Sequence, residues 1–101
     1  MPADPLAYDP TLVESFCRRW GVRELALFGS VLRKDFRPES DVDVLVSFAE
    51  DSDWDYWNWP DMLDELRRVF GRDVDLVVKE SLSNPFRRRR ILHESRVIHA
   101  A

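Results

Sequence analysis

Residues 41–48, Asp-Val-Asp-Val-Leu-Val-Ser-Phe, form the stretch that most limits how this chain can fold. Successive side chains of a β-strand point to opposite faces of the sheet. One face of this stretch would carry Val42, Val44, Val46 and Phe48. The other would carry Asp41, Asp43 and Leu45. We therefore expect a strand whose apolar face is anchored in a core and whose other face presents two carboxylates at its start.

Helices and strands are predicted to alternate along the rest of the chain. We expect helices over 10–20, 60–70 and 85–93, a short helical turn over 31–34, and strands over 22–28, 74–78 and 97–98. Asp9-Pro10 and Asn84-Pro85 are typical helix starts, because a capping side chain precedes a proline. This alternation predicts an α/β (α+β) fold in which helices flank a small sheet.

The chain has 101 residues, which suits one domain over 1–101. It has no stretch near the roughly 20 apolar residues that span a bilayer, and its first residues do not resemble a secretory signal. Cys17 is the one cysteine, which suits a reducing compartment, and we expect a cytoplasmic protein. Cys17 lies on the apolar stripe of the first predicted helix, so a core position is favoured over a nucleophile.

Charge is distributed unevenly along the sequence. The net charge is −4, but residues 35–75 hold thirteen acidic residues against four arginines. A single basic face for nucleic acid is therefore not indicated, and direct nucleic-acid binding is not expected. The Arg87–Arg90 run is either a solvated helix face or a contact for an acidic partner or for nucleotide phosphates. Four aromatic residues between Trp54 and Trp59 either cover the helix near Asp61 or form a partner surface.

Asp41 and Asp43 stand at the spacing that lets two carboxylates converge on divalent cations. Sites of phosphoryl transfer that use two metals need several carboxylate oxygens, which Mg²⁺ prefers. On this spacing alone, two solvated aspartates on an edge strand remain the alternative. Asp75 lies within the apolar stretch 74–78, where a charge is unusual unless it is paired or bound to metal.

Gly29-Ser30 follows a predicted strand and opens a helical turn. Free backbone N–H groups and a hydroxyl at such a turn can hold phosphate, and glycine permits close approach. An ordinary strand-to-helix turn is the alternative interpretation of this pair.

Together, the 27–33 segment Leu-Phe-Gly-Ser-Val-Leu-Arg, the 40–46 segment Ser-Asp-Val-Asp-Val-Leu-Val and the later Asp75 resemble the DNA polymerase β-like nucleotidyltransferases. The resemblance is nearest to the minimal nucleotidyltransferases, the MNT antitoxins, and spans about residues 22–78. It implies a small mixed β-sheet flanked by helices. Lys34 departs from the pattern, because glycine often follows Arg33 in the family.

The resemblance also implies roles for the matching positions. Gly29, Ser30 and Arg33 would bind the nucleotide. Asp41, Asp43 and Asp75 would be the catalytic carboxylates and would hold Mg²⁺, as two ions, with Asp75 helping to activate the acceptor hydroxyl. The substrate would be ATP.

The expected function is that of an antitoxin that transfers AMP from ATP to a hydroxyl, a tyrosine of a HEPN-family toxin partner. A chain of this length leaves little room for an acceptor-binding domain, so a hetero-oligomer with the acceptor protein is expected. The alternatives are an antitoxin that neutralises by binding alone, and a nucleotidyltransferase that acts on a small molecule.

Overall fold

A computed structural model describes residues 8–32 and 40–100, and for Ser30 and Val31 it describes the backbone alone. The elements are α1 (Pro10–Trp20), β1 (Val22–Phe28), η1 (Gly29–Leu32), β2 (Val42–Phe48), η2 (Tyr56–Asn58), α2 (Trp59–Phe70), β3 (Val74–Val78), η3 (Lys79–Ser81), α3 (Pro85–Glu94) and β4 (Arg96–Ala100). The predicted alternation of helices and strands is confirmed. The short helical turn begins at Gly29 rather than at Val31, directly where β1 ends.

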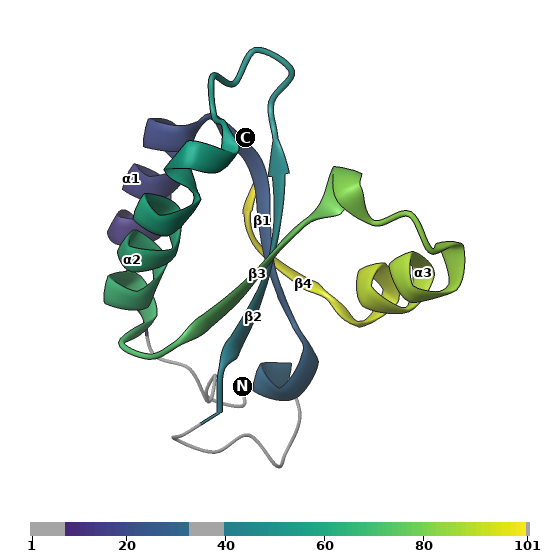
Figure 1. The fold of residues 1–101 in the computed structure, drawn as a ribbon. Coiled ribbons are helices and arrows are strands. Elements are labelled where there is room, and N and C mark those ends of the chain that lie inside the picture. The colour runs from purple at the N-terminus through teal and green to yellow at the C-terminus, as the bar shows by residue number, and fades with distance from the viewer. Residues whose placement is uncertain (1–7, 33–39, 101) are drawn as a thin grey trace.

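The strands form one mixed sheet in the order β3-β2-β1-β4. β1 pairs antiparallel with β2 and with β4, while β2 and β3 run parallel. Figure 1 shows α1 and α2 side by side against one face of the sheet and α3 on the opposite side. This is the mixed, helix-flanked α+β fold that the sequence predicts. No helix within the described residues is both long and apolar enough to cross a bilayer.

Two unequal cores hold the layers together. The larger core lies between the sheet and α1 and α2, and its fully buried side chains include Phe16, Leu25, Val44, Met62 and Leu66. The smaller core lies on the α3 side and consists of Ala26, Leu45, Leu82 and Ile91. The predicted alternation of residues 42–48 is confirmed, because the valines enter the larger core and Leu45 the smaller one. Since the second core is small, the sheet face beneath α3 is only partly covered.

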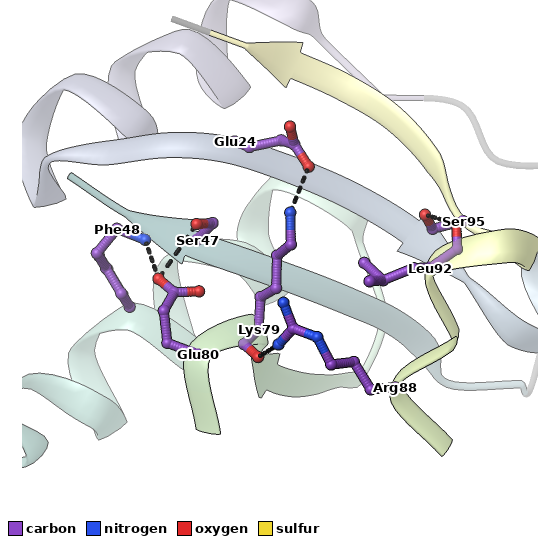
Figure 2. Close-up of polar contacts among 8 residues, drawn as sticks. All are labelled: Glu24, Ser47, Phe48, Lys79, Glu80, Arg88, Leu92 and Ser95. Carbon is purple, nitrogen blue, oxygen red and sulfur yellow. Dashed lines mark hydrogen bonds and ion pairs between the residues drawn. The ribbon is translucent and has the colours of Figure 1, made fainter. Parts of the chain in front are cut away.

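A polar network at η3 holds α3 across the sheet (Figure 2). The Glu80 carboxylate accepts hydrogen bonds from Ser47 Oγ at 3.1 Å and from the Phe48 backbone N–H at 3.0 Å. Lys79 Nζ lies 3.6 Å from Glu24 Oε1, and the Lys79 carbonyl accepts a bond of 3.0 Å from Arg88 Nη1. The connection from β3 to α3 is thus fixed to β1 and β2 before the helix begins.

The aromatic cluster of residues 54–59 divides into two parts. Trp54 stacks on Phe48 with ring centroids 4.4 Å apart, and both Trp54 and Trp59 pack against the larger core. Tyr56 and Trp57 project outward with exposed fractions of 66% and 90%. The core interpretation is therefore correct for Trp54 and Trp59, and it does not account for Trp57.

Cys17 is buried in α1, and we predict that its thiol is inert in the folded protein. Burial raises the pKa of Cys17 to about 12, and the thiolate is the reactive form. A maleimide at about pH 7.5 should therefore label the unfolded chain quickly and the native protein hardly at all. Because the unfolded thiol ionises near its ordinary pKa of 9.0, the free energy of unfolding should fall as the pH rises above that value. Native labelling as fast as in urea would contradict this prediction.

Candidate active site

Three side chains form a row across the sheet on its α3 side. Phe28 of β1 is the register partner of Asp43 of β2, and Asp43 is the partner of Asp75 of β3. Adjacent strands lie about 4.8 Å apart, so the two aspartates are immediate neighbours. Their flanking residues Val42 and Val74 enter the core on the opposite face, which directs both carboxylates to the less covered side. The paired strands thus bring together two residues that stand far apart in the sequence.

Asp41 precedes Asp43 by two residues along the chain and lies one residue before β2 begins. The adjoining Val42 N–H donates a bond of 2.9 Å to the Asp73 carbonyl, which closes the β2–β3 ladder at this end. Asp41 and Asp75 are exposed, whereas Asp43 is half-buried. Asp73, which has the same parity as Asp75, instead lies 3.6 Å from Arg67 Nε in the turn before β3. Asp43 and Asp75 are thus paired near the starts of β2 and β3, Asp41 directly precedes β2, and Asp73 belongs to the turn.

Gly29 lies so close to the Asp43 side chain that no other residue fits at this position. Its φ of +76° is a left-handed conformation that side chains other than glycine disfavour. A Cβ at this position would overlap Oδ2 of Asp43. Glycine is thus needed here for its backbone conformation and for close approach. The sequence motif pointed to an approach by phosphate; the neighbour in the structure is the carboxylate of Asp43, which follows from the antiparallel pairing of β1 with β2.

The structure describes less of the other two residues that are predicted to bind the nucleotide, Ser30 and Arg33. The backbone of Ser30 lies in η1 directly after Gly29. Arg33 and Lys34 lie outside the described residues. The assignment of Gly29, Ser30 and Arg33 to the nucleotide thus stays a prediction.

The carboxylates near the starts of β2 and β3 suit a hard cation. Asp41, Asp43 and Asp75 offer only carboxylate oxygens, which Mg²⁺ prefers, whereas the soft thiol of Cys17 lies in the core on the other face. Within residues 8–32 and 40–100, no group of three or more His, Cys, Asp and Glu side chains is gathered tightly enough to hold a metal. The chemistry of the three carboxylates fits Mg²⁺, and their role as its ligands stays a prediction.

The comparisons with known proteins agree with this architecture. Residues 10–99 match the family model of the nucleotidyltransferase domain. A Methanocaldococcus jannaschii protein, provisionally named a protein adenylyltransferase, is 33% identical over 73 residues, which are 72% of this chain and 73% of that protein. A solved structure described as a minimal nucleotidyltransferase superposes with a TM-score of 0.69 at 32% identity, covering 86% of each chain.

A more distant structure shows the same fold. It contains a tri-AMPylated Shewanella oneidensis HEPN toxin in complex with an MNT antitoxin, and the match has a TM-score of 0.62 at 20% identity. It covers 91% of this chain and 70% of the matched chain. The chain belongs to the nucleotidyltransferase domain family, among the minimal nucleotidyltransferases, and is a nucleotidyltransferase.

Proposed function

We propose that this protein is a magnesium-dependent protein adenylyltransferase that neutralises a HEPN-family toxin by transferring AMP from ATP to a tyrosine of that toxin. The observation that carries the proposal is the Asp43–Asp75 pair beside Gly29 on a face of the sheet that α3 only partly covers. The M. jannaschii relative is named for protein adenylylation, and the distant structural match includes an AMPylated HEPN toxin.

The reaction would be attack by the acceptor hydroxyl on the α-phosphorus of ATP. A new oxygen–phosphorus bond forms, the bond to the leaving pyrophosphate breaks, and the hydroxyl proton passes to a base. Mg²⁺ held by Asp41, Asp43 and Asp75 would neutralise charge that develops on the phosphates. Asp75 is exposed, so its carboxylate can also accept a hydrogen bond from the incoming hydroxyl. The pairing of β2 with β3, which sets Asp43 and Asp75 side by side, supports this assignment.

The test is transfer of label to protein. The purified chain is incubated with ATP labelled at the α-phosphate, Mg²⁺ and the product of a neighbouring HEPN-like gene. We expect label on the partner, released pyrophosphate, no transfer with EDTA, and loss of label when the acceptor tyrosine becomes phenylalanine. Label that never appears on the partner would overturn the proposal.

Neutralisation by binding alone is a second candidate, and Trp57 is the observation that favours it. Asp55 caps η2 through a bond of 2.8 Å from the Trp57 N–H, and Asn58 Oδ1 accepts the Asp55 N–H at 2.9 Å. This capping box fixes the backbone that carries Trp57, a residue that is 90% exposed, and tryptophan is enriched among the residues that dominate binding at protein interfaces. If Trp57→Ala abolished neutralisation while Asp43→Asn did not, binding alone would be the function.

A further inference from the structure

The outward side of α3 is a basic surface with an exposed aromatic ring. We define the α3 outer face by its exposed residues Phe86, Arg87, Arg89, Arg90 and His93. Phe86 is 85% exposed, and it lines an open cavity of about 390 Å³ with Arg89, Arg90 and His93. These four residues follow the spacing i, i+3, i+4, i+7, so they share one side of the helix.

The residues of the α3 outer face contribute little to the stability of the fold. The inward side of α3 supplies Ile91 and Leu92 to the smaller core, and Arg88 bonds to the Lys79 carbonyl. On the outer face, Arg90 Nε approaches Glu94 Oε1 at 3.7 Å, an exposed pair that adds little stability. Arg87 and Arg90 stand at i and i+3, where like charges repel, and an exposed phenylalanine gains no burial energy. The outer face thus presents the residue types that are enriched where protein partners bind.

The position of α3 links this surface to the candidate active site. The helix packs over the same side of the sheet as Asp43 and Asp75, through Leu45 and Ala26. Its last residues lead into β4, where Arg96 is the register partner of Leu27, one residue before Phe28 of the row that contains Asp43 and Asp75. Figure 1 shows α3 standing beside the sheet on this open side. Since α3 and the carboxylates share one side of the sheet, a partner seated on α3 would approach the protein from the side on which Asp43 and Asp75 lie.

We propose that the α3 outer face docks an acidic, tyrosine-bearing segment of the acceptor protein. Carboxylates of that segment would meet the arginines, and an apolar side chain would pack on Phe86. A nucleic acid is disfavoured because the chain carries a net charge of −4, which repels a long polyanion more than a short acidic segment. That the partner is the acceptor protein rests on the proposed function. That the partner is acidic and carries an apolar side chain rests on the arginines and Phe86 of the α3 outer face.

The test measures binding apart from catalysis. The probe is a fluorescent random copolymer of glutamate and tyrosine, titrated with the full chain in the absence of ATP. We expect salt-sensitive binding that weakens about tenfold or more in Arg89→Glu/Arg90→Glu and several-fold in Phe86→Ala. Both variants change exposed side chains, so circular dichroism should show an unaltered fold.

A charge-matched control separates docking from net charge. Arg23→Glu/Arg68→Glu reverses two exposed arginines of β1 and α2, and it should bind the copolymer like the wild type. Equal losses in both double variants, or no binding by the wild type, would overturn the proposal. Tighter binding of a single-stranded thymidine oligonucleotide would assign the surface to nucleic acid instead. A dimer of the free chain that the α3 variants dissociate would assign it to a second copy.

The transfer assay then distinguishes the two proposals. If the wild type transfers AMP, the α3 double variant should raise the KM for the protein acceptor and leave the KM for ATP unchanged. A raised KM for ATP would show that the arginines serve the nucleotide and would overturn docking. If the wild type transfers nothing, the proposed function fails, and the copolymer binding still decides the docking surface.

Discussion

The Asp43→Asn variant should lose nucleotidyl transfer by a factor on the order of 10³ while remaining folded. Asn has nearly the shape of Asp but lacks its charge, and Asp43 stands between Gly29 and Asp75 in the row that would hold the cation and the reacting phosphate. The change should appear in kcat rather than in the KM for the acceptor. The measurement is the rate of label transfer from ATP at saturating Mg²⁺, together with the thermal unfolding midpoint.

Asp73→Asn is the matched control for this prediction. Asp73 precedes the same strand as Asp75 and has the same parity, but its side chain is 78% exposed and pairs with Arg67 in the turn. An exposed pair of this kind contributes at most about 1 kcal/mol, so the variant should keep wild-type transfer. If Asp43→Asn retained more than about a tenth of the activity, or if both variants lost it equally, the assignment of the row would be wrong.

The β2 strand shows why much of the fold could be predicted from the sequence. Its valines recur at every second position, and a shift of one residue would move all of them out of the larger core. The same alternation placed Asp43 on the face opposite the larger core, and the apolar neighbours of Asp75 placed it on a strand of its own. Alternation of this kind arises because one face of a strand is buried, so it predicts the buried face from the sequence of a single segment.

The relation between Gly29 and Asp43 could not be predicted in this way. It depends on the register of β1 against β2, and a pairing register is a property of two segments together. The division of the aromatic cluster is similar: Trp54 is half-buried because Phe48 offers it a stacking partner, whereas Trp57 has no comparable place in the core. Composition and spacing predict the same burial for both tryptophans, and only the packing of Trp54 against Phe48 of β2 makes their burial differ.

The Gly29→Ala variant should lose more transfer activity than its loss of stability explains. A residue other than glycine at a φ of +76° costs about 1–2 kcal/mol, and the added methyl would also overlap Oδ2 of Asp43. The carboxylate must move to relieve this overlap. A displacement of about 1 Å at a reacting centre can cost about 10²-fold in rate, so transfer should fall by that order.

Gly71→Ala isolates the backbone effect from the overlap. Gly71 has a φ of +70°, nearly that of Gly29, yet a Cβ there would meet no atom within 4 Å. Gly71→Ala should lose about 1–2 kcal/mol of unfolding free energy, measured by urea denaturation, and Gly29→Ala should lose at least as much, while only Gly29→Ala loses transfer. Equal activity in the two variants would mean that the position of the Asp43 carboxylate does not limit the reaction. Loss in Gly29→Ala alone would show that this glycine serves catalysis by making room for the carboxylate, beyond its part in the turn.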